Sequence, residues 1–586
     1  MRSFVSCISC FRGFNVGSGD EARMTGNDES GHSDFGFCPH SIVIRVSSFG
    51  FVFLLAALAL FPSTAHALKI PRPTYSLDFG AYGELDGSSD SSRLRHPPHA
   101  WNFTLNGSLT WTFLSLGLNL MYNSDDQFTA QRINQLSFNP SWKWGRVYTG
   151  DFSTTLTPLT LSGVSLYGGG IELFPGSFRL AALAGRSRRA STDSLDSCYT
   201  QHIYGFRFGA EQLSITALKA LDDTASNSFT DSTHTQAQDN LVLSLNSRFN
   251  ILPTFTCDLE AAASAFTRDL RSDTVSDSTP VIGRIPKWVW SVYRPRRSSC
   301  VGYALRGTAR YAPNSANLSL SFNQTTPGYT SLGATSVKTD YRDLRADAST
   351  TVIPRTSVGL YCELGSDNLL GDKLATTHTT DFGGTLNTTP ATPLTIAAAY
   401  SHIARVKTTA NDSFGENSVA QTLSLTPNLN LQLGPTTHTL GLVTNYQDLA
   451  NRMPFTDSSG VPSGRTATLG VNYSLTPGIP VTLSTGLSWT IPLAGSGETA
   501  SASYQNYSLT GNKAFLDNRL NNSLTIAYQP SGEGRNLAVN GAHNFSVTTR
   551  DVINLTWYVA WFIAAPSAGK NSLNDRISLS YNRKLL

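Results

Sequence analysis

Charged residues are scarce in this sequence: Asp, Glu, Lys and Arg together make up only 15% of its 586 residues. Soluble domains typically carry about 25%. The formal net charge of +3 is too small to indicate a nucleic-acid partner. The mean hydropathy is nevertheless close to neutral, at −0.15. Ser, Thr, Asn and Gly therefore replace the missing charge, a balance that suits strands with one polar and one apolar face.

Long apolar runs are absent after residue 67. A transmembrane helix needs about 20 consecutive apolar residues. The longest later candidate, residues 557–565, falls far short of that length. The sequence therefore predicts no transmembrane helix in the chain that follows residue 67.

One earlier apolar stretch, residues 49–61, contains no charge and ends at Pro62. It is too short to span a bilayer and suits the apolar region of a secretory signal. Ala65-His66-Ala67 supplies a cleavage site, and Arg45 supplies a thin positive flank. Cleavage would leave Leu68, and not a lipid-modified Cys, at the new N-terminus. A buried helix of a soluble protein is the alternative interpretation.

The sequence thus divides into three predicted parts. Residues 43–67 form the signal peptide, and residues 68–586 form the exported protein. Residues 1–42 are rich in Gly, Ser and Asp and show no strand period. We expect them to be a mis-assigned start or a disordered extension, with translation beginning near Val43 or Val46.

Few cysteines follow the predicted cleavage site, namely Cys198, Cys257, Cys300 and Cys362. Their spacings match no zinc motif. An oxidising periplasm would permit disulfides among them, and the sequence cannot choose between the pairings. Unpaired thiols that act as small apolar residues are equally compatible with the sequence.

The abundant feature is alternation. Residues 101–113 place every aromatic residue and Leu on odd positions, with Thr, Asn or Ser between them, and residues 114–122 reverse the phase. The reversal predicts a tight turn near Thr112–Ser115, or else a bulged strand. The same period of two recurs to the end of the chain, for example at residues 255–265, 301–311 and 553–563.

This alternation favours a membrane barrel over other β architectures. A sandwich array would show linkers and a propeller would show a fixed repeat, and neither is visible. Unpaired backbone groups in lipid cost several kcal/mol each, so strands that cross a membrane must close on themselves. At roughly 20 residues per strand and connection, we predict an all-β fold with a single large antiparallel transmembrane β-barrel of roughly 22–26 strands.

Two local patterns and the last strand carry a resemblance to a known class. The first pattern is Gly150-Asp-Phe-Ser153 with Leu161-Ser-Gly-Val164, followed by Gly168-Gly-Gly-Ile-Glu-Leu173 and Phe178-Arg-Leu-Ala-Ala-Leu-Ala-Gly185. The second is Pro327-Gly-Tyr-Thr-Ser-Leu-Gly333, leading to Asp367-Asn-Leu369. With them, the sequence resembles the large, poorly characterised, porin-like outer-membrane β-barrels of Gram-negative bacteria.

The resemblance implies a location and partners. The protein would be exported through the inner membrane and inserted in the outer membrane, among lipid and lipopolysaccharide. Residues 576–586 resemble the C-terminal strand that the barrel-assembly machinery recognises in such proteins. They end in Leu586, whereas an aromatic residue is usual at that position. An unknown surface or periplasmic partner remains open.

Charged residues on the polar faces of three predicted strands are candidates for lining the lumen: Arg248, Asp258, Glu260, Arg306 and Arg310. Arginines in a pore favour anions. The carboxylates would point to the same side, however, so the opposed charges can instead pair with one another. Both interpretations stay open.

A second charged feature is a basic cluster interleaved with Trp288, Trp290 and Tyr293, and its basic residues are Arg284, Lys287, Arg294, Arg296 and Arg297. One hypothesis is a loop that contacts anionic lipopolysaccharide or folds inward to attract anions. The other is a solvated loop that tryptophans anchor at the membrane interface.

The sequence offers no constellation for catalysis, cofactor binding or metal binding. No Gly-x-Ser-x-Gly motif occurs, and His96-Pro-Pro-His99 lacks a nearby third ligand. Gly168–170 is followed by no Lys-Ser or Lys-Thr, which excludes a phosphate loop. We therefore expect a channel for small polar solutes and not an enzyme. A structural barrel that scaffolds a surface or secretion complex is the alternative.

Overall fold

The computed structural model describes most of the chain after residue 71. The predicted signal peptide, the N-terminal extension and Leu586 lie outside the described residues. The ranges described are 72–89, 99–124, 134–191, 197–227, 235–275, 287–351, 353–409, 416–451, 464–493, 503–531, 534–565 and 571–585.

Within these ranges the chain forms one 26-stranded antiparallel sheet. The strands are β1 (Thr74–Ser88), β2 (His99–Trp111), β3 (Leu114–Asn123), β4 (Gln135–Trp142), β5 (Gly145–Ser153), β6 (Ser165–Leu173), β7 (Phe178–Arg188), β8 (Thr200–Ala210), β9 (Leu213–Asp223), β10 (Asp239–Leu252), β11 (Phe255–Thr267), β12 (Ser299–Tyr311), β13 (Ala316–Thr325), β14 (Tyr341–Thr350), β15 (Thr356–Asp367), β16 (Ala375–Ala391), β17 (Leu394–Thr409), β18 (Glu416–Leu433), β19 (Thr436–Asn451), β20 (Gly464–Thr476), β21 (Val481–Leu493), β22 (Tyr504–Phe515), β23 (Leu520–Ser531), β24 (Gly534–Ser546), β25 (Asp551–Ala564) and β26 (Ser572–Lys584).

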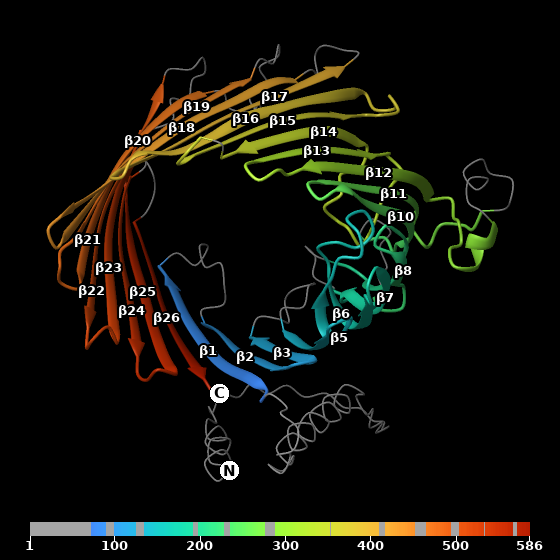
Figure 1. Cartoon of the computed structure of the whole chain (residues 1–586), viewed down its shortest axis with the longest axis horizontal. Coiled ribbons are helices and arrows are strands. Elements are labelled where there is room, and N and C mark those ends of the chain that lie inside the picture. The colour runs from blue at the N-terminus through green and yellow to red at the C-terminus, as the bar shows by residue number, and fades with distance from the viewer. Residues whose placement is uncertain are drawn as a thin grey trace, which may run out of the picture. The chain divides into compact units, whose positions relative to one another are not determined.

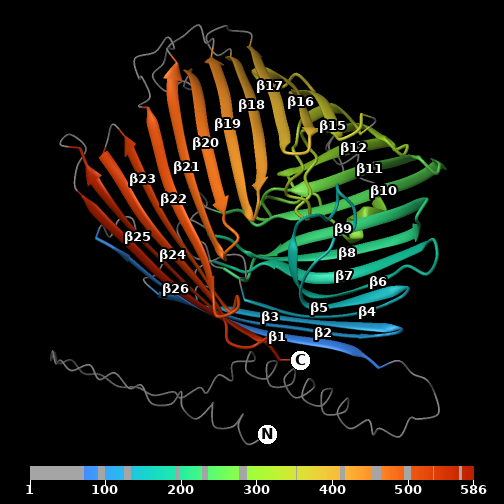
Figure 2. The same ribbon diagram turned by 60° about the vertical axis from the view of Figure 1, so that its left-hand side comes forward.

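The sheet closes on itself. Each strand pairs with its neighbours in sequence, and β1 pairs with both β2 and β26, for example through Gly83 opposite Leu579. Figures 1 and 2 show the resulting barrel wall. Closure leaves no free sheet edge, which is the condition for crossing lipid with strands. The predicted all-β barrel is confirmed, and its strand number lies at the upper end of the predicted range.

The two ends of the barrel differ in the length of their connections. At one end the strands join through short turns, such as residues 112–113, 143–144, 211–212 and 392–393. At the other end the connections are longer, such as residues 224–238, 268–298 and 326–340. We call these the turn end and the loop end. In bacterial barrels of this architecture, short turns face the periplasm and long loops face the exterior.

The two faces of the wall differ as the alternation predicts. On β8, Tyr204, Phe206 and Phe208 are exposed on the outer face, whereas Ile203 and Arg207 point to the inner face. Exposed large apolar side chains recur at alternate positions on most other strands. The predicted phase reversal is a tight turn at Thr112 and Phe113, between β2 and β3. An apolar exterior around a closed sheet suits a lipid surrounding.

Helical structure is minor. Among the described residues, no helix is long and apolar enough to cross a membrane. A short 3-10 helix, η5 (Lys287–Ser291), interrupts the connection between β11 and β12.

The described cysteines form no disulfide with one another. Cys198, Cys257, Cys300 and Cys362 are all free thiols. Cys257 and Cys362 share the outer faces of β11 and β15 with apolar neighbours, whereas Cys300 lies on the inner face of β12. Of the two interpretations that the sequence left open for these four cysteines, the structure therefore agrees with unpaired thiols and not with disulfides.

Candidate functional site

The connection between β5 and β6, residues 154–164, folds into the barrel. Its three leucines, Leu156, Leu159 and Leu161, are buried. A tight turn forms inside it, where the hydroxyls of Thr157 and Thr160 are hydrogen-bonded and the amide of Leu161 donates to the carbonyl of Thr157. Loops normally stay on the surface of a protein. A loop that buries leucines instead needs an apolar surface against which those leucines can pack.

A second loop-end connection, residues 326–340, folds inward and meets the first one. The hydroxyl of Tyr329 donates to the carbonyl of Leu159 at 2.6 Å, and the hydroxyl of Ser331 donates to the carbonyl of Thr160 at 2.6 Å. The amide of Ser162 donates to the carbonyl of Gly333 at 2.8 Å. We call residues 154–164 and 326–340 the two inward connections. They contain residues 161–164 of the first sequence pattern and residues 327–333 of the second.

The inner wall beneath the inward connections is apolar, unlike the polar lumen that the sequence predicted. Asn240 ties the second connection to this wall, because its side chain donates to the carbonyl of Thr330 and accepts from the amide of Leu332. Gly302 permits the close approach, since a Cβ there would lie 2.1 Å from the backbone nitrogen of Tyr329. The apolar patch runs from β5 to β12 and consists of Tyr148, Phe152, Leu166, Ala181, Leu183, Ile203, Leu218, Ala220, Val242, Ala262 and Ala304.

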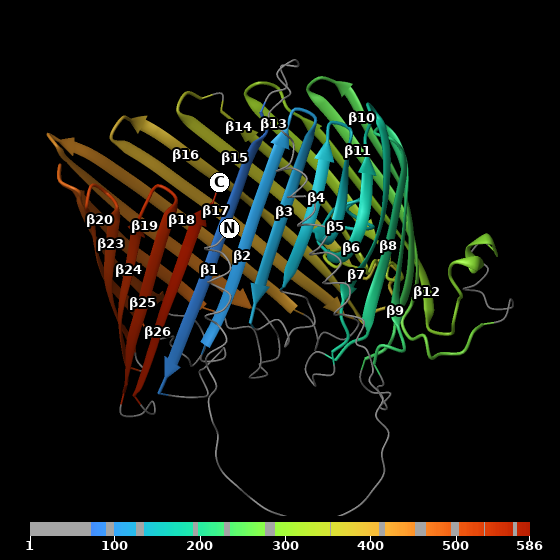
Figure 3. The same cartoon turned by 90° about the horizontal axis from the view of Figure 1, so that it is seen from below.

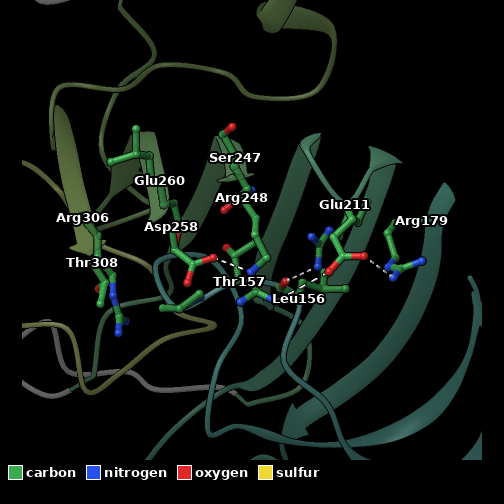
Figure 4. A pocket seen from close by; sticks show the side chains of 14 residues that line it. Leu156, Thr157, Arg179, Glu211, Ser247, Arg248, Asp258, Glu260, Arg306 and Thr308 are labelled. Carbon is green, nitrogen blue, oxygen red and sulfur yellow. Dashed lines mark hydrogen bonds and ion pairs between the residues drawn. The ribbon is translucent and has the colours of Figure 1, made fainter. Parts of the chain in front are cut away.

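A cavity of about 460 Å³ opens beside the first inward connection (Figure 4). Leu156, Thr157 and Pro158 form one side of it. The other side comes from β7, β8, the turn after β8, and β10 to β12, and carries four arginines and three carboxylates, a formal sum of 4 − 3 = +1. These are Arg179, Arg207, Arg248, Arg306, Glu211, Asp258 and Glu260.

Most of these charges are paired. Arg248 forms ion pairs with Asp258 and, at 3.9 Å, with Glu211. Glu211 also binds Arg179 at 3.0 Å, as the dashed lines in Figure 4 indicate. Paired charges largely cancel, so this side of the cavity attracts anions far less than its arginine content alone would suggest.

Two arginines of the cavity have no carboxylate partner among the described residues. Arg207 donates instead to the carbonyl of Leu156 and to the hydroxyl of Ser214. Arg306 makes no ion pair within the described part of the chain and faces the cavity opposite Glu260 in the strand register. Arg306 is therefore the side chain with most freedom to meet a solute.

Glu260 connects the wall to the first inward connection. It is buried on β11, and its Oε1 accepts from the amide of Leu159 at 3.3 Å. Its Oε2 has no hydrogen-bond partner among the described residues. A buried carboxylate oxygen without a partner is costly, so this carboxylate is a strong candidate for contact with a solute or with water.

The structure places the sequence-predicted residues as follows. It brings Arg248, Asp258, Glu260 and Arg306 together around one cavity. Arg310 shares their inner face but lies nearer the turn end, where its Nε donates to Asn317. Whether these residues line a conducting path stays a prediction.

The basic cluster lies elsewhere. Arg284 falls outside the described residues, and Lys287 begins η5. Arg294, Arg296 and Arg297 follow η5 in the connection that returns to β12. The sequence left open whether this loop folds inward, and Figure 3 shows its described part outside the barrel wall.

Two interruptions of the alternation on the wall strands signal the inward connections. Alternation fails at Leu241-Val-Leu243 and within Ala261-Ala-Ala-Ser-Ala265, where the inner face becomes apolar or small. An apolar residue on an otherwise polar face needs a cover, and that cover comes from the inward connections. Arg207, on the inner face of β8, also lines the cavity, although it was not among the residues predicted from the sequence to line the lumen.

One part of the inner wall, formed by five consecutive strands, is polar but carries no charged side chain. From β20 to β24, the register assigns to the inner face only Ser, Thr, Asn, Gln, Gly, Ala and Pro, together with Tyr504 at the start of β22. Examples are Thr468, Asn472, Thr510, Asn512 and Asn540. We call this the neutral arc. It gives the lumen hydrogen-bonding groups without a strong electric field.

No metal site appears in the described residues, where no three His, Cys, Asp or Glu side chains gather as a ligand group.

No family model matches the chain, and no curated protein matches it.

Solved structures give weak likenesses only. OpdK of Pseudomonas aeruginosa, crystallised with vanillate, covers 60% of this chain and 93% of its own at 10% identity, with a TM-score of 0.30. OccK8 (OprE) of the same species covers 66% and 98% at 11% identity, with a TM-score of 0.29. The P pilus usher pore PapC covers 87% and 99% at 9% identity, with a TM-score of 0.26.

At these identities and TM-scores the solved structures do not assign the chain to a class, which rests instead on the chain's own geometry. The closed sheet, the apolar exterior, and the difference between the turn end and the loop end together meet the requirements for crossing lipid. The chain is a large β-barrel of the outer-membrane type. Its candidate functional site is the charged cavity beside the two inward connections. The neutral arc, in contrast, carries no charge.

Proposed function

We propose that this barrel is a porin-like pathway for small polar solutes across the bacterial outer membrane. The supporting observation is the lining of its inner wall. The neutral arc supplies hydroxyl and amide groups along five strands, and the charged cavity is almost balanced. Groups that can replace a solute's water hydrogen bonds without trapping it favour passage over tight binding.

The two inward connections give the pathway its constriction. They occupy the lumen against β5 to β12 and are held by buried leucines and Tyr329 rather than by surface contacts alone. A barrel of this strand number has a lumen wide enough to need water or a plug. Loops packed inside the wall restrict solute size while leaving the barrel scaffold unchanged.

Conductance across a planar lipid bilayer tests the proposal. Purified protein should give discrete conductance steps, with weak preference between K⁺ and Cl⁻ because the cavity charges are nearly balanced. Liposomes containing the protein should swell in solutions of small neutral sugars but not in solutions of large dextrans. Folded protein that inserts and yet stays silent in both assays would contradict a pathway and favour a scaffold barrel.

A further inference from the structure

The connection between β11 and β12 covers part of the outer wall. Its described parts are residues 268–275 and 287–298, and we call them the outer connection. Figures 1 and 3 show η5 outside the wall beside β10 to β12. The rest of the outer wall carries exposed apolar side chains that suit lipid. Here the chain's own residues take the place of lipid at the loop end.

The outer connection is anchored firmly. Val289 and the almost fully buried Tyr293 pack on Leu241 and Ala265, which are outer-face residues of β10 and β11. The hydroxyl of Tyr293 is hydrogen-bonded to Thr267 at 2.7 Å. Burial raises the pKa of Tyr293 to about 12, so the hydroxyl stays neutral under any physiological condition.

A salt bridge lies under this anchor on the outer face. Lys219 of β9 pairs with Asp239 of β10, and the Lys219 ammonium lies 5.2 Å from the centre of the Tyr293 ring. An ion pair on a lipid-facing surface would be expensive unless something polar or aromatic covered it. The cover provided by Tyr293 fixes the outer connection against the wall at this height.

The outer connection has a strong positive excess. Its described residues contain six basic and two acidic side chains, which gives 6 − 2 = +4. Residues 287–298 contain no carboxylate at all. The basic residues are Arg268, Arg271, Lys287, Arg294, Arg296 and Arg297, and the acidic ones are Asp269 and Asp273.

Arg271 pairs with Asp269 at 3.1 Å, but the other positive charges are poorly neutralised within the described part of the chain. Arg297 meets Asp273 at only 4.0 Å, and both side chains are about four-fifths exposed, at 78% and 80%. Pairs of that kind contribute little. Arg294 is exposed and has no ion-pair partner among the described residues. Arg296 donates to the carbonyl of Ser272, but its buried Nε finds no acceptor in the described part of the chain.

We propose that the outer connection binds the phosphate groups of the lipids that surround the barrel at its loop end. Guanidinium groups bind phosphate through paired hydrogen bonds, and a basic segment at a membrane surface favours anionic headgroups. The position decides the source of the phosphate. The arginines sit outside the wall, directly beside the lipid-facing residues, where headgroups and not lumen solutes are present.

Native mass spectrometry of the purified full-length barrel tests this binding. Diphosphoryl lipid A and monophosphoryl lipid A serve as probes in detergent, and inorganic phosphate serves as a competitor. The wild-type protein should retain the diphosphoryl probe most strongly. The variant R294E/R297E should lose roughly 30-fold or more in affinity, because each basic residue beside an anionic surface contributes about a fivefold factor.

The matched control places the same charge change at the other end of the barrel. Arg519 and Arg550 are exposed in turn-end connections, so R519E/R550E should leave lipid binding within about twofold of wild type, since their sites lie beyond the reach of screened charges. A heat-dependent gel shift verifies folding, and R294Q/R297Q provides a milder variant with a smaller loss in the same direction.

Other outcomes overturn the proposal. Equal binding by wild type and R294E/R297E would show that the outer connection does not bind the lipid. Equal losses in the two charge-reversal variants would show only a general charge effect. Displacement of the lipid by millimolar inorganic phosphate would indicate a free-anion site instead of a headgroup site. None of these results depends on whether the barrel conducts.

Discussion

The hydroxyl of Tyr329 donates a 2.6 Å hydrogen bond to the carbonyl of Leu159, although the two residues are 170 positions apart in the chain. One lies in each inward connection, and both are buried. This contact therefore joins the two connections across the lumen side of the wall. Burial of both side chains means that neither connection can leave the wall without exposing apolar surface of the other.

Replacement of Tyr329 should loosen the constriction. Y329A removes a fully buried aromatic side chain, a change that typically costs about 3–5 kcal/mol. The inward connections should then detach locally, and single-channel conductance should rise with more current noise. Y329F keeps the packing and removes one hydrogen bond worth about 1 kcal/mol, so its effect should be small.

An aromatic residue on the opposite inner wall provides the control for Tyr329. Tyr558 of β25 shares the inner face with Asn540 in the register, and Y558A should leave conductance noise unchanged. Limited proteolysis gives a second readout, because cleavage within residues 154–164 should become faster in Y329A alone. Unchanged conductance and proteolysis in Y329A would mean that the inward connections do not form the constriction.

Arg306 should influence ion selectivity more than the paired arginines do. R306Q removes one of the two cavity arginines without an ion pair among the described residues, so the preference should shift toward cations. The other, Arg207, is held by Ser214 and Leu156. The change in permeability ratio should be at most about fivefold, because one charge at 4 Å in water contributes about 1 kcal/mol. Reversal potentials in a KCl gradient measure it.

A second arginine on the same strand serves as the comparison for Arg306. Arg310 shares the inner face of β12 but lies away from the cavity, beside Asn317. R310Q should therefore shift the reversal potential less than R306Q does. Equal shifts would show that the lumen field, and not the cavity, sets the selectivity.

Much of the fold could be predicted from the sequence because alternation reports directly on the two faces of a strand. Residues 101–122 gave both the strands β2 and β3 and the turn between them. The charged inner faces of β10 to β12 were also predictable, and Arg248, Asp258, Glu260 and Arg306 do meet at one cavity. Local patterning fixes which face a residue occupies, whatever the register of distant strands.

The inward connections could not be predicted in the same way. Residues 154–161 read Thr-Thr-Leu-Thr-Pro-Leu-Thr-Leu, which resembles a short strand with lipid-facing leucines. Those leucines instead point to an inner patch formed by other strands, such as Val242 and Ala262. Contact between segments so far apart depends on closure of the whole barrel, and no local period encodes it.

Acid should weaken the junction at the end of the second inward connection. Asp340 accepts from Lys373 at 2.5 Å and from the amide of Leu369 at 2.8 Å. Burial alone would raise the pKa of Asp340, but these hydrogen bonds outweigh it and hold the pKa below its ordinary value. A lowered pKa stabilises the fold above the unfolded value of about 3.9, and the stabilisation is lost as the pH falls through the folded value.

Hydrogen exchange at the amide of Leu369 measures this loss. Its protection factor should be constant near neutral pH and should fall below about pH 4, where the carboxylate takes up a proton. D340N should remove the pH dependence without backbone strain, because Asn tolerates the left-handed φ of 54° at this position. The amide of Leu270, which donates to the carbonyl of Ala237, should keep its protection over the same range.

The membrane-facing surface can be tested with two adjacent residues in the middle of β22. Leu509 is exposed on the outer face, whereas Thr510 points to the neutral arc, where its hydroxyl is hydrogen-bonded to Thr525. L509R should destabilise the folded barrel by about 2–4 kcal/mol in bilayers if the residue lies near the midplane, because the guanidinium enters hydrocarbon. T510R places the same charge in the lumen and should cost far less. Urea unfolding in lipid vesicles distinguishes the two variants, and equal destabilisation would mean that this face of β22 does not contact lipid.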